Sequence, residues 1–102
     1  MLTTVYEKAG TKLTVWPEGR MDTVSSPILE RELRQHLEGI KDIVMDFSNV
    51  AYVSSGGIRV LLALDKLISE RGGSLKLIHV KEHILEIFEL VGFMQLVEVV
   101  QD

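Results

Sequence analysis

A predicted buried strand that leads through a short loop into a helix constrains this chain more than any other feature. Residues 43–47 are a run of apolar and β-branched residues, which is typical of a buried strand. Apolar residues then recur at helical spacing and predict a helix over about 57–71, which Gly72-Gly73 ends. Two serines and two glycines, residues 54–57, lie at the junction. The sequence therefore places hydroxyl groups and small residues at the start of a helix.

The chemistry of this junction favours a negative group. The first N–H groups of a helix have no partner within it, and the helix dipole favours negative charge there. Ser54 or Ser55 can cap the helix, and the two glycines let another molecule approach the backbone. Three interpretations fit: an ordinary cap and turn, a nucleotide loop, or a serine that is itself phosphorylated. The nucleotide loop is disfavoured because neither Gly-Lys-Ser/Thr nor Gly-x-Gly-x-x-Gly is present. The pattern alone does not separate the other two.

Three segments of the chain, taken together, carry a family resemblance. Residues 46–61 are Asp-Phe-Ser-Asn-Val-Ala-Tyr-Val-Ser-Ser-Gly-Gly-Ile-Arg-Val-Leu. Gly19-Arg20-Met21-Asp22 is followed by Ser25-Ser26-Pro27, and residues 87–93 are Ile-Phe-Glu-Leu-Val-Gly-Phe. In this order, the three resemble the signature segments of STAS domains, the anti-sigma factor antagonist family. The first of the flanking segments is similar to Gly-x-Leu-Asp-x-x-Thr-x-Pro and the second to Leu-Phe-x-x-x-Gly-Leu.

The remaining pattern predicts a single α/β domain. A chain of 102 residues is expected to form one domain, residues 1–102. The predicted elements are strands 3–7 and 12–18, a helix starting at 25–27, strand 43–47, helix 57–71, strand 75–80, helix 83–91 and strand 96–100. The order β-β-α-β-α-β-α-β implies a mixed sheet of about five strands with helices packed against it. The STAS (SpoIIAA-like) fold implied by the resemblance has this arrangement.

Helical periodicity predicts which side chains are buried. Ser25 or Ser26 is expected to cap the first helix. The predicted core positions are Leu29, Leu33, Leu37 and Ile40 on the first helix, Val60, Leu61, Leu64, Leu67 and Ile68 on the second, and Ile84, Ile87, Phe88 and Val91 on the third. Ile58 and Leu62 fall on the outer side of the second helix. Two apolar side chains beside the serines, among charges of both signs, predict a small docking surface.

Composition and motifs argue against several classes of function. The net charge of -4 disfavours nucleic acid, and no uncharged apolar run reaches 18 residues, so no membrane insertion is expected. The chain has no cysteine, and its first residues lack the pattern of a signal peptide, which favours the cytoplasm. His79 and His83 do not fit the helical zinc-protease pattern, and the Gly-x-Ser-x-Gly elbow of hydrolases is missing. We therefore expect no catalytic residue, metal or cofactor.

The resemblance implies a phosphorylation-controlled protein switch in bacterial transcription. In the family, the unphosphorylated antagonist binds an anti-sigma factor and so releases a sigma factor. That anti-sigma factor is a GHKL-type serine kinase that uses ATP, and a PP2C-like phosphatase reverses the modification. The family's acceptor falls on Ser55; Ser54 is the alternative acceptor, because it stands where the family often has Asp.

The expected partner-binding residues are Asp22, Ser54, Gly56, Gly57, Ile58, Arg59 and Leu62. For Asp22 two interpretations stay open. It is either a turn residue before a helix, which Asp favours, or a neighbour of the phosphorylated serine, as the matching aspartate is in the family.

Two other functions remain as alternatives. STAS domains also serve as scaffolds in stressosome assemblies and as accessory subunits of lipid or anion transport systems. The glycine-containing loop could instead make the chain a small anion- or nucleotide-binding module.

Overall fold

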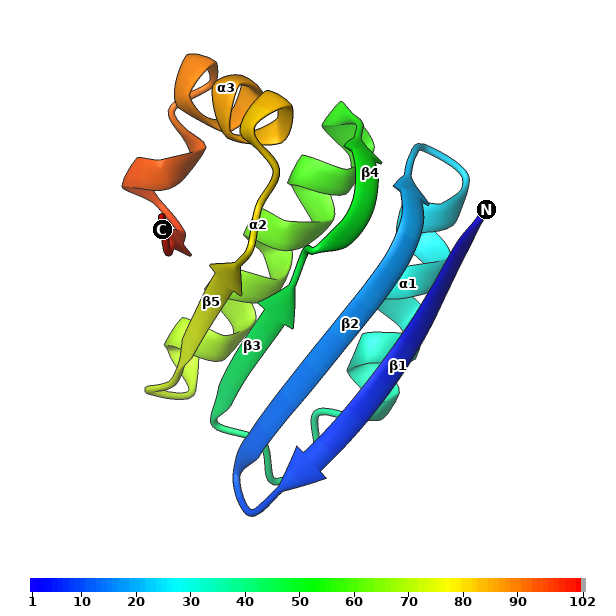
Figure 1. The fold of residues 1–102 in the computed structure, drawn as a ribbon. Coiled ribbons are helices and arrows are strands. Elements are labelled where there is room, and N and C mark those ends of the chain that lie inside the picture. Colours follow the sequence, from blue (N-terminus) through cyan, green and yellow to red (C-terminus); the bar gives the residue numbers. More distant parts are fainter. Residues whose placement is uncertain (102) are drawn as a thin grey trace.

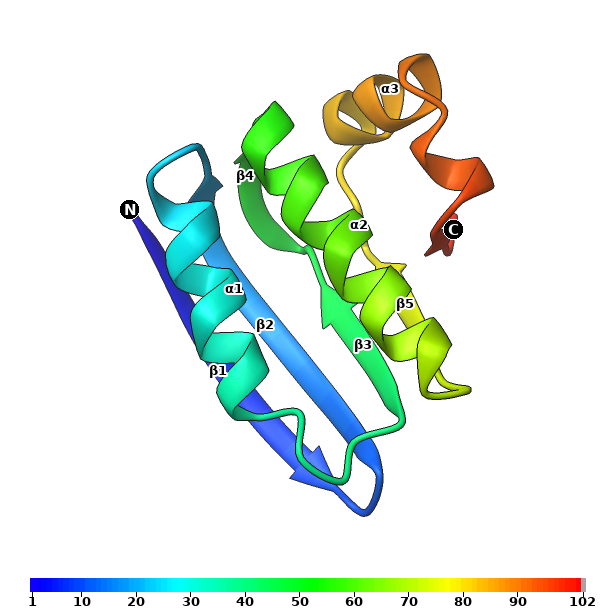
Figure 2. The ribbon, with the colours of Figure 1, turned by 180° about the vertical axis from the view of Figure 1, so that it is seen from behind.

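Six strands form one mixed sheet, and α1 and α2 cover the same face of it (Figure 1; Figure 2). This computed structural model describes residues 1–101. The elements are β1 (Leu2–Ala9), β2 (Lys12–Met21), α1 (Ser25–Gln35), β3 (Asp42–Asp46), β4 (Asn49–Val53), α2 (Ser55–Glu70), β5 (Ser74–Ile78), α3 (Glu82–Leu90), a short 3-10 helix η1 (Phe93–Gln95) and β6 (Glu98–Val99). The predicted mixed sheet with helices packed against it is confirmed.

The long strand β2 organises the sheet. It pairs antiparallel with β1 along its length, and the strand order is β1-β2-β3-β5-β6. Its first half, residues 12–15, pairs parallel with β3, and its last residues, 18–21, pair parallel with β4. Both β3 and β4 therefore lie along the same edge of β2, one after the other. This arrangement brings the end of β4 next to the end of β2 and to the start of α1 (Figure 1).

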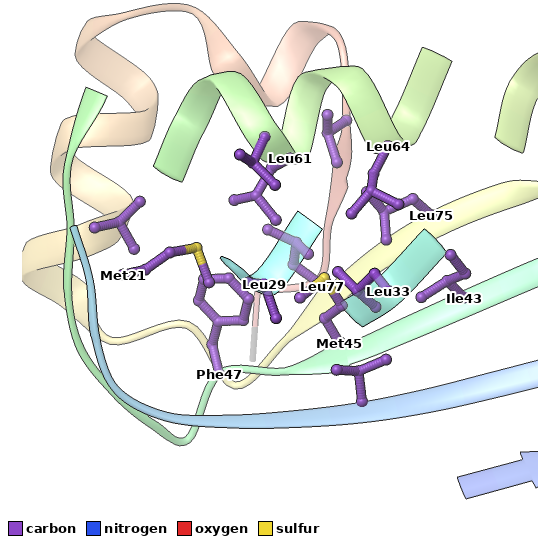
Figure 3. Close-up of a cluster of buried hydrophobic side chains, with 14 of the residues drawn as sticks. Met21, Leu29, Leu33, Ile43, Met45, Phe47, Leu61, Leu64, Leu75 and Leu77 are labelled. Carbon is purple, nitrogen blue, oxygen red and sulfur yellow. The ribbon is translucent and has the colours of Figure 1, made fainter. Parts of the chain in front are cut away.

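One hydrophobic core lies between the sheet and the two helices. Leu13 and Val15 alternate with more exposed residues along β2 and are fully buried, as the period-two pattern predicts. Figure 3 shows side chains from strands and helices that converge there: Met21, Leu29, Leu33, Ile43, Met45, Phe47, Leu61, Leu64, Leu75 and Leu77. Burial of such side chains is the main favourable term in folding.

Strand β4 was not predicted. Residues 49–53 were assigned to the loop before the second helix, yet they pair with the end of β2. A tight turn starts the strand: the Asp46 carboxylate accepts the N–H of Ser48 at 2.9 Å, and Val50 N–H donates to the Phe47 carbonyl at 3.0 Å. The element order therefore has one more strand than the sequence indicated.

Two helix predictions were wrong in detail. Helix α1 ends at Gln35, although Leu37 and Ile40 beyond it are buried as expected. Val91, predicted to face the core, is 57% exposed, because α3 ends at Leu90 and Gly92 turns the chain with a φ of 74°. Phe93 enters the core instead and stacks on Phe88 with ring centroids 4.2 Å apart. Within residues 1–101, none of the helices has the length and apolar character that a membrane span requires.

Candidate functional site

Ser54 belongs to the framework of the site. It lies between β4 and α2 in extended backbone conformation, and its Oγ accepts the N–H of Gly57 at 3.2 Å. Its own N–H donates to the carbonyl of Met21 at 2.8 Å, which ties the start of α2 to the end of β2. The residue is 8% exposed. Of the two serines that could cap the helix, Ser54 does so, and its hydroxyl points inward.

Ser55 is placed differently. It is the first residue of α2 and is exposed. The first turn of the helix contains no acidic residue. Ser55 is thus exposed at a helix start that has no acidic residue in its first turn.

The two glycines are close to the β2–α1 loop. A Cβ on Gly57 would lie 2.9 Å from both Cγ and the carbonyl oxygen of Met21. A Cβ on Gly56 would meet Cα of Thr23 at 3.4 Å, which is an ordinary contact. The loop after β2 and the first turn of α2 therefore pack directly on each other. Gly57 is required for this approach, whereas Gly56 has room for a side chain.

Asp22 lies in the loop just before the neighbouring helix, α1. Its carboxylate accepts the N–H of Ser25 at 2.8 Å and that of Val24 at 3.0 Å. The hydrogen bond from the backbone of Ser25, more than any other contact, holds the pKa of Asp22 below its usual value. Asp22 is thus a turn residue before a helix, between Met21 and Thr23, whose atoms come nearest to the Cβ positions of Gly57 and Gly56. Its role as a neighbour of a phosphorylated serine stays a prediction.

The prediction that Ser25 or Ser26 caps α1 was wrong. The Ser25 hydroxyl donates to the carbonyl of Arg20 at 2.7 Å and accepts the N–H of Asp22 at 2.9 Å. Ser26 donates its hydroxyl to the carbonyl of Asp22. Both serines are thus engaged with the loop that precedes the helix, and the N-cap residue of α1, Val24, makes no side-chain cap hydrogen bond.

Ile58 and Leu62 are not the outward-facing pair that helical phase predicted. Both are half-buried and pack against the core, as does Leu67. The prediction assumed that α2 has a narrow buried face and a broad solvent-exposed face. Its apolar face is wider than that and includes Ile58 and Leu62 at its edges. The exposed residues of its first two turns are Ser55 and Arg59. Any docking surface here combines these two polar residues with the accessible parts of Ile58 and Leu62.

Sequence reasoning missed two exposed apolar side chains at the start of α1, close to the candidate site. Val24 is 75% exposed and Ile28 is 44% exposed, and both line a hollow of about 340 Å³ next to Asp22. A second hollow, of about 220 Å³, lies between the starts of α1 and α2. Its walls are Thr23, Pro27, Glu30, Ser55, Gly56, Arg59 and Val60. The sequence signal that could have revealed this surface is Val24, an apolar residue in the loop directly after Asp22-Thr23.

Each of the three histidines contacts another group of the protein. The ring of His79 lies 3.1 Å from the Asp46 carboxylate, and His83 Nε2 lies 2.9 Å from the Ala51 carbonyl oxygen. His36 stacks on Tyr6, and its Nδ1 lies 2.8 Å from the Glu32 carbonyl oxygen. Within residues 1–101, no cluster of three metal-binding side chains occurs.

Comparison with known proteins identifies the family. Residues 5–98 match the family model described as "Mlab, STAS domain". The chain belongs to the STAS domain family. The resemblance seen in the three sequence segments is thereby confirmed.

Two relatives of this STAS domain are named as anti-sigma factor antagonists. BtrV of Bordetella bronchiseptica is 32% identical over 80 residues, which are 78% of this chain and 69% of the relative. The anti-sigma-B factor antagonist of Bacillus subtilis is 28% identical over 81 residues, 79% of this chain and 74% of the relative. Both comparisons connect the chain with regulatory proteins.

Solved structures share the fold. The anti-sigma factor antagonist SpoIIAA in its unphosphorylated form has a TM-score of 0.77 at 11% identity, covering 98% of this chain and 89% of that one. SpoIIAA in the phosphorylated form has a TM-score of 0.75 at 12% identity, covering 98% and 93%. The SpoIIAA-like fold that the sequence indicated is confirmed.

The contact at Gly57 generates a stability prediction. Gly57→Ala should destabilise this STAS domain by about 1–3 kcal/mol, because the new methyl group has no space beside Met21. Gly56→Ala is the matched control and should be neutral or slightly stabilising, because alanine favours the helix. Thermal unfolding followed by circular dichroism measures both. Equal melting temperatures for the two variants would contradict the close contact.

The position of Leu62 generates a second prediction. Leu62→Asp should lower stability by about 1–2 kcal/mol, or roughly 4–16 °C in melting temperature, because it places a charge against the core. Lys66→Asp, on an exposed position one turn later, is the control and should change stability little. If the two variants have the same melting temperature, Leu62 does not pack on the core as the structure indicates.

Proposed function

We propose that this STAS domain is an anti-sigma factor antagonist that works as a phosphorylation-controlled protein switch. In its unphosphorylated form it binds an anti-sigma factor, a GHKL-type serine kinase, and so releases a sigma factor. The observation that carries the proposal is the exposed position of Ser55 at the start of α2, in a chain whose relatives are named as antagonists.

The neighbouring serines support Ser55 as the phosphate acceptor over Ser54. The Ser54 hydroxyl is buried and serves as a hydrogen-bond acceptor for the N–H of Gly57. Phosphorylation there would require the first turn of α2 to open. Ser55 needs no such rearrangement, because its side chain is already accessible.

The fold should tolerate a phosphate at this position. Phosphorylation adds about 1.5–2 negative charges, and a helix N-terminus favours them. SpoIIAA offers a parallel, since its unphosphorylated and phosphorylated forms match this chain with TM-scores of 0.77 and 0.75. The switch is therefore proposed to act on binding and not on folding.

The docking surface is proposed to consist of Ser55, Gly56 and the accessible parts of Ile58, Arg59 and Leu62, with Ser54, Gly57 and Asp22 as its framework. A strongly solvated dianion on Ser55 would lie beside the half-buried apolar side chains of this surface. Bringing a partner against it would require removing water from the phosphate, which opposes binding. The modification thus weakens the complex while the fold is kept.

The partner enzymes carry out the chemical steps. The Ser55 oxygen attacks the γ-phosphorus of ATP, the bond to ADP breaks, and a base of the kinase takes the hydroxyl proton. A PP2C-like phosphatase then hydrolyses the phosphate ester with water. This chain supplies the acceptor and the surface, and we propose no catalytic residue or cofactor for it.

Two observations favour a second candidate. Ser54 stands where the family often has Asp, and the matching family model is described as "Mlab, STAS domain". A scaffold or accessory subunit of a stressosome or transport system would need the docking surface but not the switch. Its binding would be insensitive to phosphate on Ser55.

Labelling by the kinase tests the acceptor. With the cognate kinase and ATP, the protein should gain one phosphate on Ser55, located by phosphopeptide mass spectrometry. Ser55→Ala should abolish labelling. Ser54→Ala should still be labelled, although loss of the cap should cost about 1 kcal/mol of stability. The reverse pattern of labelling would assign the acceptor to Ser54.

Binding by the phosphorylated protein tests the switch. Protein carrying phosphoserine at position 55 should keep its circular dichroism spectrum and bind the kinase at least ~10-fold more weakly, a loss of about 1.4 kcal/mol or more. Ser55→Ala should bind like the unmodified protein and stay bound when ATP is added. If the phosphorylated sample binds as tightly as the unmodified one, the switch proposal fails and the scaffold proposal takes its place.

A further inference from the structure

Arg59 lies one helical turn after Ser55 on the same face of α2. The two residues are separated by four positions, the spacing at which helical side chains are neighbours. Both are exposed, and both line the hollow of about 220 Å³ between the starts of α1 and α2. Thr23 and Glu30 form the opposite wall. A group attached to the Ser55 oxygen would therefore enter a space that the Arg59 side chain already borders.

The Arg59 guanidinium has no ionic partner. Within residues 1–101, no carboxylate lies within 4.0 Å of it. Three of the other four arginines are engaged: Arg34 binds Glu30 at 2.9 Å, Arg71 donates to the Leu37 carbonyl at 2.8 Å, and Arg20 stacks over the Tyr52 ring. Arg59 can therefore bind a new anion without breaking an existing ion pair.

We propose that a phosphate on Ser55 is bound by the guanidinium of Arg59. This inference rests on the proposed function, because it assumes that Ser55 is the modified residue. The guanidinium presents N–H donors in a planar fork that matches two phosphate oxygens. The carboxylate across the hollow, Glu30, already accepts two hydrogen bonds from Arg34, at 2.9 and 3.2 Å, which reduces its repulsion of the phosphate.

The pairing gives phosphorylation a second effect on partner binding. Before modification, the Arg59 charge is exposed on the docking surface and can contact an acidic group of the partner. After modification, the phosphate on the same helix holds the guanidinium, so that contact is lost. The switch then combines a new dianion with the withdrawal of an attractive cation.

The test measures the second pKa of the phosphate, which is about 6 for phosphoserine. Phosphoserine is incorporated at position 55 during protein synthesis, so that no kinase is needed, and ³¹P NMR follows its titration. In Arg59→Gln this pKa should be higher than in the unsubstituted protein by about 0.3 pH unit, because the cation favours the dianion. Arg59→Lys should give an intermediate value.

Lys66→Gln is the matched control. It removes one positive charge from an exposed position of α2 farther along the helix and should leave the pKa unchanged. A second readout, the ¹⁵N–¹H signal of Arg59 Nε, should shift on phosphorylation of the unsubstituted protein, and 1 M salt should diminish the shift.

Equal phosphate pKa values in the unsubstituted protein and Arg59→Gln, with an unmoved Nε signal, would overturn the pairing. That result would leave the proposed switch intact, because kinase binding is measured separately. If kinase labelling fails while the pKa difference is found, the pairing stands and the proposed modification by the kinase falls. Circular dichroism of Arg59→Gln verifies that the exposed substitution keeps the fold.

Discussion

The contact between the start of α2 and the end of β2 determines the rest of the site. The Ser54 N–H donates to the Met21 carbonyl, and Gly57 lies so close to Met21 that a methyl group has no room. Because Asp22 and Thr23 follow Met21 directly, this contact fixes the β2–α1 loop against the first turn of α2. The exposed surface of both helix starts is thereby presented as one unit, although the two segments are about thirty residues apart in sequence.

The length of β2 makes that contact possible. A strand of ten residues has room for β3 along its first half and β4 along its end. Without β4, the chain would leave β3 far from Met21, and the serines would start a helix with nothing beside them. The turn at Asp46 to Val50, which shifts the chain from one strand to the next, is thus as important for the site as the serines themselves.

Features that depend on local pattern could be predicted, whereas those that depend on distant contacts could not. The buried strand at 43–47, the second helix and the stripe of Leu29 and Leu33 follow from residue type and spacing. Strand β4 escaped prediction although Val50, Tyr52 and Val53 favour strands, because it follows β3 after a very short turn and its pairing with β2 is a contact between distant segments. The α1 cap was misassigned because both serine hydroxyls are taken by the preceding loop, which sequence does not reveal. The family signature, by contrast, located the candidate site from the residues alone.

The adjacent serines at the start of α2 also affect how such a protein can change over evolutionary time. Ser54 fills a structural position, so only another small capping residue can replace it at little cost. Ser55 has an exposed side chain, so the fold accepts many residues there. Under the proposed function, a single codon change at Ser55 would therefore fix the switch in one state while the fold is kept. Regulation of the proposed kind would then be gained or lost independently of the scaffold that carries it.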